Sequence, residues 1–388
     1  MGQRLLVFPM DLAGHYLRCI ELCRRLEDSY EIRFADSVKY GKYAKKAGYG
    51  TFEVKGLEAE SGASSTSRLD FSWINRPVLQ SILESQIKAI EEYRPDTVLG
   101  DASFTLKMAA EKTQTEYASL LNGYMTKYYR FIRMPPHNHP GYKYSGKMPS
   151  KIFGKIAHEV EYRTFKKIHR PFNQIRREYR LPSREYFLDE FEGDINLICD
   201  LPELFPQKKL PANYSFTGPL YYIGDDSEDE IRRFLDSHRP SILVSMGSTG
   251  SRENTSFLKC PAFKKYGIVS SSGEDQNLGQ TNIYHKLFIN NTAIMDRVDA
   301  VICHGGNGTV YQALTYGVPV LCITENLEQE WNVQRIREMG LGDFVENLNP
   351  ETLSEQVDYW IERRKDPVFT EIKEEIETFM KKPLKLKP

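Results

Sequence analysis

The stretch that decides the fold is residues 296–332, DRVDAVICHGGNGTVYQALTYGVPVLCITENLEQEWN. Residues 300–303 are a short apolar run, typical of a buried parallel strand. Glycines break this run, a helix is predicted to begin at Thr309 and to stop at Gly317, and a second apolar run follows at residues 318–323. Strand, glycine loop, helix and strand in this order form a crossover unit of a parallel α/β sheet.

The glycine loop of this unit predicts an anion site, with phosphate as the natural occupant. Its backbone N–H groups and the positive end of the helix point at whatever lies above the loop. The loop lacks the Gly-Lys-Ser/Thr of a P-loop, and Tyr311 stands where a dinucleotide fingerprint has its third glycine. His304, Asn307 and Thr309 offer donors that can hold a diphosphate without lysine or metal. In a ligand-free alternative, Thr309 and Gln312 form a capping box and the glycines only make a tight turn.

The motif HGGNGTVYQAL, with GVPVL and ENLEQEWN after it, resembles the C-terminal signature of GT-B glycosyltransferases of the UDP-glycosyltransferase type, the bacterial members of glycosyltransferase family 1. This resemblance implies a donor site: the ribose contacts Gln312, the sugar hydroxyls contact Glu328 and Gln329, and the diphosphate contacts His304, Gly305, Gly306, Asn307, Gly308 and Thr309. The sequence departs from the family at two points. The usual ribose-binding Glu is Gln312, and the usual Asp-Gln is Glu-Gln, so the sugar and the nucleotide stay open while the class does not.

Two segments near the N-terminus extend the resemblance. LLVFPMDLAGH resembles the opening strand and loop of the family, in which the residue at His15 is the catalytic base, although Arg18 stands where the family often has proline. GDASFTLKMAAEK resembles the segment whose aspartate, here Asp101, bonds that histidine and fixes its tautomer. Both residues follow predicted strands, at the edge where parallel sheets bind ligands. Without the resemblance, His15 could merely begin a helix or bond a carbonyl, and Asp101 could be an N-cap.

Further candidates depend on weaker patterns. Gly247 and Ser248 resemble the Gly-Ser turn at the edge of the donor cleft, and Phe288 stands where the family stacks an aromatic ring on the nucleotide base, although a buried core position explains Phe288 equally well. The aromatic stretch 122–144 supplies the candidates for an acceptor pocket, Tyr124, Tyr128 and Tyr129.

No carboxylate lies between Glu116 and Glu159, whereas this stretch holds seven Lys and Arg residues. A positive surface is predicted. It favours an anionic acceptor or an anionic membrane surface, and the alternative is the ordinary solvated face of a helix.

The length of 388 residues predicts two domains. We expect an N-terminal acceptor-binding Rossmann-like domain at residues 1–200, a linker at 201–224 and a C-terminal nucleotide-sugar domain at 225–365. Residues 366–388 are expected to form a last helix and a basic tail that pack back on the first domain. The predicted fold class is α/β of the GT-B type, with two Rossmann-like domains facing each other across a cleft.

Composition excludes other classes. The formal net charge of −1 argues against a nucleic-acid-binding protein. The sequence has no run of 18 apolar residues, and Met1 leads directly into a strand, so we expect a cytoplasmic protein, with peripheral contact to the inner membrane face as an added option. The six cysteines form no C-x-x-C pair, which is typical of core residues in a reducing compartment. No metal and no cofactor are expected.

The function predicted from these patterns is inverting transfer of a sugar from a nucleoside diphosphate sugar, expected to be a UDP-sugar, to a hydroxyl of a small-molecule or lipid acceptor. His15 is the expected base and Asp101 its partner. Two alternatives stay open: a nucleotide-sugar epimerase of the same fold, and a catalytically silent relative that binds a nucleotide or activates a partner enzyme.

Overall fold

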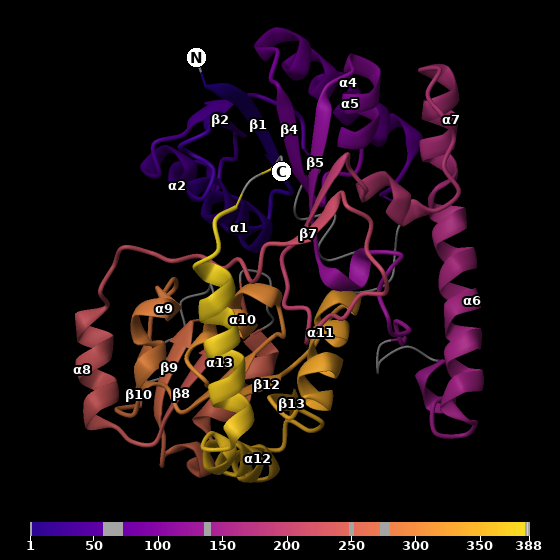
Figure 1. Ribbon diagram of the computed structural model, residues 1–388. Helices are drawn as coiled ribbons and strands as arrows, with labels where there is room; N and C mark the ends of the chain where they lie inside the picture. Colours follow the sequence, from indigo (N-terminus) through magenta and orange to yellow (C-terminus); the bar gives the residue numbers. More distant parts are fainter. Residues whose placement is uncertain are drawn as a thin grey trace. The chain divides into compact units, whose positions relative to one another are not determined.

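The computed structural model describes residues 2–56, 73–135, 141–247, 252–271, 280–384 and 386. They fall into two compact units, the first comprising Met1–Leu220 and Lys382–Pro388 and the second Tyr221–Lys381. Each unit is built on its own sheet with helices packed against it (Figure 1). The prediction of two α/β domains is confirmed.

The sheet of the first unit is entirely parallel, in the order β3-β2-β1-β4-β5-β6-β7. The order reverses between β1 and β4, where Pro9 lies opposite Asp101. Ligands bind outside the carboxyl ends of the strands at such a switch point. The strands are β1 (Gln3–Pro9), β2 (Tyr30–Ala35), β3 (Gly50–Phe52), β4 (Thr97–Asp101), β5 (Glu116–Leu121), β6 (Ile195–Ile198) and β7 (Tyr214–Phe216).

The helices of the first unit follow ordinary start and stop signals. In α4, for example, the Asn75 side chain accepts from the Val78 backbone N–H at 3.2 Å, and Arg94 ends the helix in the left-handed conformation. The helical elements are α1 (Ala13–Arg24), α2 (Gly41–Lys46), α4 (Arg76–Tyr93), α5 (Leu106–Thr113), η1 (Gly123–Met125), η2 (Tyr142–Tyr144), α6 (Ser150–Ile168), α7 (Arg170–Glu178) and η3 (Phe187–Phe191).

The second unit repeats this architecture with the order β10-β9-β8-β11-β12-β13, and its switch point lies between β8 and β11. Strands β8, β11 and β12 are buried on both faces, which explains their uninterrupted apolar sequences. The strands are β8 (Ser241–Ser245), β9 (Gly267–Ser271), β10 (Ile283–His285), β11 (Ala300–Cys303), β12 (Val320–Cys322) and β13 (Gly342–Phe344).

The helices of the second unit cover the two faces of its sheet. They are α8 (Asp229–Ser237), η4 (Arg252–Lys259), η5 (Pro261–Phe263), α9 (Asn291–Ile294), η6 (Met295–Arg297), α10 (Asn307–Thr315), α11 (Leu327–Glu338), α12 (Pro350–Arg363) and α13 (Pro367–Met380). Within the described residues, none of the helices combines the length and the apolar character needed to cross a bilayer.

The unit boundaries differ from the expected ones in two places. The first unit extends to Leu220, because the expected linker contributes β7 to its sheet through pairing with β6. Helix α13, expected on the first domain, belongs to the second unit, where the Phe369 backbone lies beside Gly317 at the end of α10. The first unit regains the chain only from Lys382, whose carbonyl accepts a hydrogen bond from Arg25 at 2.9 Å.

Candidate active site

The first unit brings His15 and Asp101 together at its switch point. His15 is the third residue of α1 and Asp101 the last of β4, and His15 Nδ1 lies 2.9 Å from Asp101 Oδ1. The aspartate is fully buried, whereas 15% of the histidine side chain is exposed. Asp101 is not the N-cap of the following helix, because α5 begins at Leu106 and Thr105 takes that position. A buried carboxylate that orients a partly exposed imidazole suits proton transfer at the open side of the ring.

Arg18 completes this pair in a way the sequence analysis did not foresee. Its Nε donates to Asp101 Oδ2 and its Nη2 to Oδ1, each at 2.5 Å, while its Nη1 donates to Asn122 Oδ1 at 3.0 Å. Burial alone would raise the pKa of Asp101, but the Arg18 guanidinium, helped by His15, outweighs it and holds the pKa well below its usual range. The signal in the sequence was the departure from proline at this position.

Arg18 also bears on the tautomer of His15. Its Nη2 lies 3.1 Å from His15 Nδ1, the atom that contacts Asp101. A guanidinium can only donate hydrogen bonds, and an ionised carboxylate can only accept them. With its proton on Nδ1, the ring donates to Asp101 and keeps a lone pair on Nε2. With a bare Nδ1, the ring accepts from Arg18 and carries its proton on Nε2, where it cannot act as a base.

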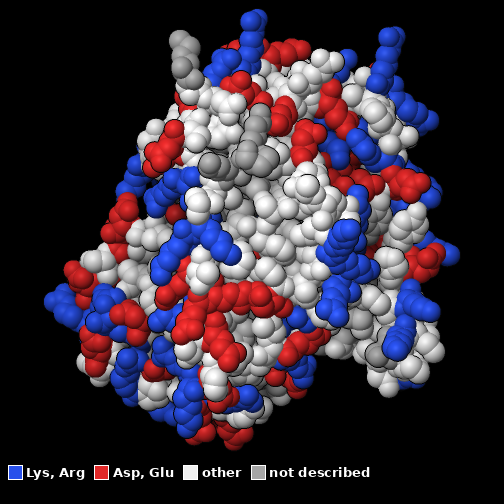
Figure 2. All heavy atoms as spheres, viewed as in Figure 1, with Lys and Arg blue, Asp and Glu red and all other residues white. Residues whose placement is uncertain are grey.

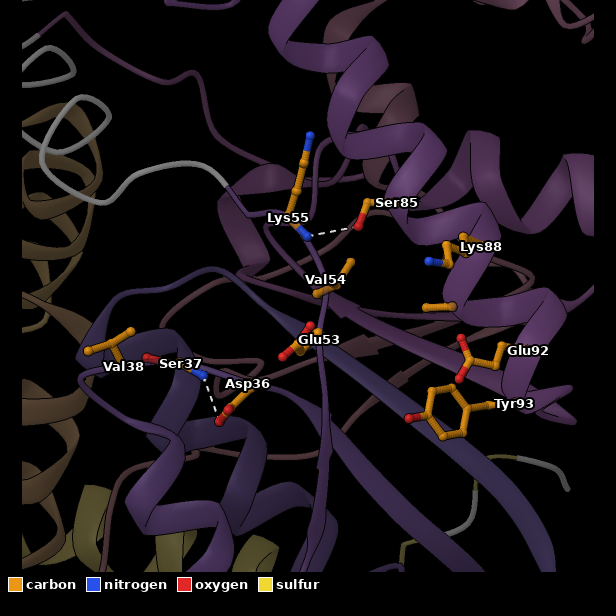
Figure 3. A pocket seen from close by; sticks show the side chains of 11 residues that line it. Asp36, Ser37, Val38, Glu53, Val54, Lys55, Ser85, Lys88, Glu92 and Tyr93 are labelled. Carbon is orange, nitrogen blue, oxygen red and sulfur yellow. Dashed lines mark hydrogen bonds between the residues drawn. The ribbon is translucent and has the colours of Figure 1, made fainter.

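A pocket of about 750 Å³ opens between the segment after β2, the segment after β3 and helix α4 (Figure 3). Ser37 lines it and donates to Asp11 at 2.5 Å, in the loop between β1 and α1. Charges of both signs line the pocket, with Glu53 and Lys55 following β3 and Lys88 and Glu92 on α4. Its residues come from three separate segments, so the pocket could not be predicted from a single sequence motif. Its size and polar lining suit a small molecule with hydroxyl groups.

The three tyrosines predicted for an acceptor pocket lie elsewhere in the first unit. Tyr124 and Tyr129 are buried, and their ring centroids lie 5.8 Å and 6.1 Å from that of Phe205. Tyr128 is half-buried, with its centroid 5.2 Å from that of Tyr214. These contacts secure the aromatic segment to the first unit, and an acceptor role for the tyrosines stays a prediction.

In the second unit, His304 follows β11 at the switch point, held between two glycines. A Cβ added at Gly247, which follows β8, would lie 2.7 Å from His304 Cε1, and one added at Gly306 would lie closer still to Nε2. Gly247 also has a φ of +70°, which side chains rarely adopt. Glycine is therefore required on both sides of the ring. Ser248, predicted beside Gly247, lies outside the described residues.

The surroundings of His304 favour its neutral imidazole and leave one ring nitrogen available to a ligand. Burial lowers its pKa, and a hydrogen bond with the Ser245 backbone and the Glu328 carboxylate oppose this only in part. Its Nδ1 is buried and has no hydrogen-bond partner among the described residues. A phosphate oxygen beside Nδ1 would stabilise a proton on this atom and satisfy it.

Helix α10 begins at Asn307, two residues earlier than predicted, with Gly306 as its N-cap. Within the described part of the chain, no side chain caps this end. The capping-box alternative for Thr309 and Gln312 is wrong, because Gln312 Nε2 donates to the Tyr222 carbonyl at 3.0 Å and its Oε1 accepts from Asn291 at 3.2 Å. The first N–H groups of the helix are therefore not capped by either side chain, and such a helix end can bind an anion.

Two of the predicted donor contacts have structural tasks in the fold. Gln329 Oε1 accepts from the backbone N–H groups of Glu325 at 2.6 Å and Asn326 at 3.2 Å, in the capping box of α11. Glu328 is half-buried in the first turn of the same helix. Gln312 connects α10 to the backbone at Tyr222. Contacts of Gln312, Glu328 and Gln329 with a ribose or a sugar stay predictions.

Phe288 is 45% exposed, so the buried-core alternative for it is wrong. Its ring centroid lies 6.4 Å from that of Tyr222, and the neighbouring Leu287 is exposed as well. The exposed ring is accessible for the predicted stacking on a base, and this role of Phe288 stays a prediction. The described residues hold no group of three His, Cys, Asp or Glu side chains placed to bind a metal ion.

Comparison with known proteins adds to this geometry. Residues 271–379 match the family described as erythromycin biosynthesis protein CIII-like, C-terminal domain. The chain is 26% identical over 352 residues to a PGL/p-HBAD biosynthesis glycosyltransferase of Mycobacterium tuberculosis, covering 89% of this chain and 81% of the relative.

Solved structures show the same fold. The glycosyltransferase SnogD from Streptomyces nogalater superposes with a TM-score of 0.68 at 18% identity, covering 98% of this chain and 96% of that one. The glycosyltransferase SsfS6 of Streptomyces sp. SF2575, complexed with thymidine diphosphate, gives a TM-score of 0.64 at 16% identity, covering 97% and 96%. With its two parallel-sheet units, the protein is a glycosyltransferase of the GT-B fold.

Proposed function

We propose that the protein transfers a sugar, with inversion, from a nucleoside diphosphate sugar to a hydroxyl group of a small-molecule or lipid acceptor. The observation that carries the proposal is the His15–Asp101 pair at the switch point of the first unit. A fully buried, ionised aspartate at 2.9 Å from a partly exposed imidazole is the arrangement expected of a general base and its partner.

In the proposed reaction, His15 carries a proton on Nδ1, and this N–H donates a hydrogen bond to the Asp101 carboxylate, which stays ionised. The lone pair on Nε2 takes the proton of the acceptor hydroxyl while the hydroxyl oxygen attacks the anomeric carbon of the donor. The bond between that carbon and the diphosphate oxygen breaks with its electron pair, and the nucleoside diphosphate leaves. The ionised Asp101 stabilises the imidazolium that forms. A general base of this kind contributes roughly 10²–10⁴-fold to the rate.

We assign Arg18 the role of a positioning residue. Its two hydrogen bonds hold the Asp101 carboxylate ionised and in one orientation, which favours the productive tautomer of His15. Its own contact with Nδ1 favours the other tautomer. The contacts of Arg18 with Asp101 and with His15 therefore act in opposite directions on the tautomer, and a proline at this position could make neither contact.

The second unit is proposed to hold the donor. His304 Nδ1 and the first N–H groups of α10 would bind the diphosphate and stabilise the charge that develops as it leaves. Gln312 would contact the ribose, Glu328 and Gln329 the sugar, and Phe288 the base. The structural relative solved with thymidine diphosphate supports a pyrimidine nucleotide, and the expected uridine diphosphate belongs to the same class. No resident cofactor takes part in this scheme.

The pocket of Figure 3 is the candidate for the acceptor in the first unit. Carboxylates and amines line it together, which suits hydroxyl groups that both donate and accept hydrogen bonds. Its Ser37 is linked through Asp11 to the loop that leads into His15.

Product analysis tests the proposal. The purified protein is incubated with UDP-sugars and dTDP-sugars and with a panel of phenols, alcohols and lipid extracts, and mass spectrometry records the products. The expected result is an acceptor heavier by one sugar, with NMR showing an inverted anomeric configuration, and loss of this product in His15→Ala. Interconversion of the donor without transfer would support the epimerase. Binding of the nucleoside diphosphate with no turnover of any donor would support the silent relative.

A further inference from the structure

Helix α6 presents an apolar stripe to solvent, which a helix of a soluble protein normally turns inward. Ile152, Ile156 and Val160 recur every four residues, so they lie along one side of the helix. Their exposed fractions are 52%, 49% and 51%. The opposite side of the helix is buried through Gly154 and Phe165. The exposed stripe therefore does not belong to the core of the first unit.

One exposed aromatic residue precedes this stripe in the chain. Tyr144 of η2 is exposed, as are the three stripe residues Ile152, Ile156 and Val160. Phe131 and Ile132 are exposed too, but Ile132 contacts α6 at Gly154, on the side opposite the stripe, so they do not belong to it. We call four residues the α6 patch: Tyr144, Ile152, Ile156 and Val160.

Lysines flank the patch at a regular spacing. Lys143, Lys147, Lys151 and Lys155 are all exposed, and the amines of Lys143 and Lys147 lie 5.2 Å and 5.7 Å from the centre of the Tyr144 ring. Figure 2 shows mainly white and blue atoms at the lower right, where Figure 1 draws the start of α6.

The carboxylates that follow these lysines in the sequence have other partners. From residue 117 to residue 158 the sequence has none. Beyond it, Glu159 accepts from Arg163 at 2.6 Å, and Glu161 accepts from Arg133 at 2.5 Å. Lys143, Lys147, Lys151 and Lys155 are thus exposed, whereas two other cations of the same stretch form ion pairs, Arg133 with Glu161 and Lys127 with Glu192.

We infer that the α6 patch docks on an anionic lipid bilayer. An apolar stripe flanked by lysines is the pattern of a helix that lies in the membrane interface, since the lysine stems cover apolar surface while the amines reach the lipid phosphates. Tyr144, with the amines of Lys143 and Lys147 over its ring, suits the boundary between lipid headgroups and water. A second copy of this chain is disfavoured, because a symmetric dimer would bring two copies of the same lysine-rich surface together. This inference does not depend on the proposed function.

The test is cosedimentation of the full chain with vesicles of phosphatidylcholine alone and with vesicles that also contain phosphatidylglycerol. The expected result is pelleting with the anionic vesicles at low salt, release as the salt concentration rises, and little pelleting with the neutral vesicles. Equal pelleting with both vesicle types, or none with either, would overturn the inference, and the latter would favour a soluble acidic protein as the partner.

Two variants separate charge from apolar contact. Replacing Lys143, Lys147, Lys151 and Lys155 by Gln is expected to weaken binding roughly 10²- to 10³-fold, at about fivefold per cation. Replacing Ile152, Ile156 and Val160 by Ser keeps every charge and is expected to weaken binding at least roughly tenfold. Unchanged binding of the serine variant would mean that the stripe does not enter the bilayer, which overturns the docking mode.

A matched control removes the same charge elsewhere. The exposed lysines Lys112, Lys259, Lys264 and Lys373 lie outside α6, and their replacement by Gln changes the net charge equally. This control is expected to bind as the wild type does. If it loses binding to the same extent as the α6 variant, attraction depends on net charge alone and the proposed surface is wrong. The thermal midpoint of each variant shows whether it is folded.

Discussion

The two units place their site residues by the same topology but build the sites from different materials. Each sheet reverses its order between two central strands, and in each unit a histidine follows one of these strands. In the first unit, charged side chains surround His15, with Asp101 and Arg18 both buried. In the second unit, glycines and a helix N-terminus surround His304.

These different surroundings suit the two histidines to different chemistry. Proton transfer needs a histidine whose tautomer and charge are controlled, and buried ionic partners provide that control. Binding of a diphosphate needs N–H groups at close range, and glycines let the backbone approach. The following predictions ask whether the first unit performs the chemistry and the second the binding.

The largest effect is expected for His15→Ala. Transfer should fall roughly 10²–10⁴-fold, because the acceptor hydroxyl loses its base. Affinity for the nucleoside diphosphate, measured by isothermal titration, should stay close to that of the wild type, since the donor residues belong to the second unit. Wild-type turnover by the folded variant would remove His15 from the mechanism.

Arg18→Met tests the ionic partners of the same histidine. The variant removes the bidentate guanidinium from the buried Asp101 carboxylate, which keeps only its contact with His15. Loss of one partner of a buried ion pair costs about 3–5 kcal/mol of stability. We expect a lower thermal midpoint of the first unit. Arg18→Lys keeps the charge and loses the paired hydrogen bonds, so kcat should fall while KM changes little. A methionine variant as stable as the wild type would show that Arg18 does not support Asp101.

Acid should weaken the first unit through the same carboxylate. The pKa of Asp101 is depressed in the folded state, so its stabilising contribution is complete above the ordinary aspartate pKa and is lost as pH falls toward the depressed value. Buried Glu190 acts in the same direction. Burial alone would raise its pKa, but Arg176 and His169 hold the pKa below its usual value. The thermal midpoint should therefore decrease as the pH is lowered from 7 to about 3. The decrease should be smaller in Arg18→Met, because this variant lacks the guanidinium that depresses the pKa of Asp101. Parallel pH profiles would contradict this.

In the second unit, His304→Ala should weaken binding of the nucleoside diphosphate by about 1.5–3 kcal/mol, the usual worth of a hydrogen bond to a charged group. Titration with UDP and with dTDP measures this loss for both nucleotides. The stability should change little, because glycines, Gly247 and Gly306, lie against the ring on two sides. An unchanged dissociation constant would mean that the glycine loop is only a turn.

The sequence predicted the two α/β domains and the positions of the site loops, because buried parallel strands and glycine loops leave local patterns. It could not predict what long-range pairing decides. Strand β7 has three residues and is recognisable only by its partner β6. The contacts of Arg18 join α1 to β4 and to Asn122, and the pocket of Figure 3 collects residues from three segments. Helix α10 starts at Asn307, with Gly306 in an extended backbone conformation as its N-cap. The sequence instead suggested a start at Thr309, because threonine is a common residue at helix N-termini.

The smallest and most discriminating effect is expected for Gly308→Ala. Among the described residues, a Cβ at Gly308 would meet no atom within 4 Å, and alanine in the first turn of a helix costs the fold nothing. The variant should therefore keep the thermal midpoint of the wild type. If a phosphate approaches this turn as closely as the N–H groups of α10 invite, the added methyl group obstructs it, and affinity for the diphosphate should fall roughly tenfold, or about 1.4 kcal/mol. Gly306→Ala is the contrasting variant, because its Cβ would collide with the His304 ring and lower stability and affinity together. Full affinity in Gly308→Ala would place the diphosphate away from the helix end, leaving His304 alone to bind it.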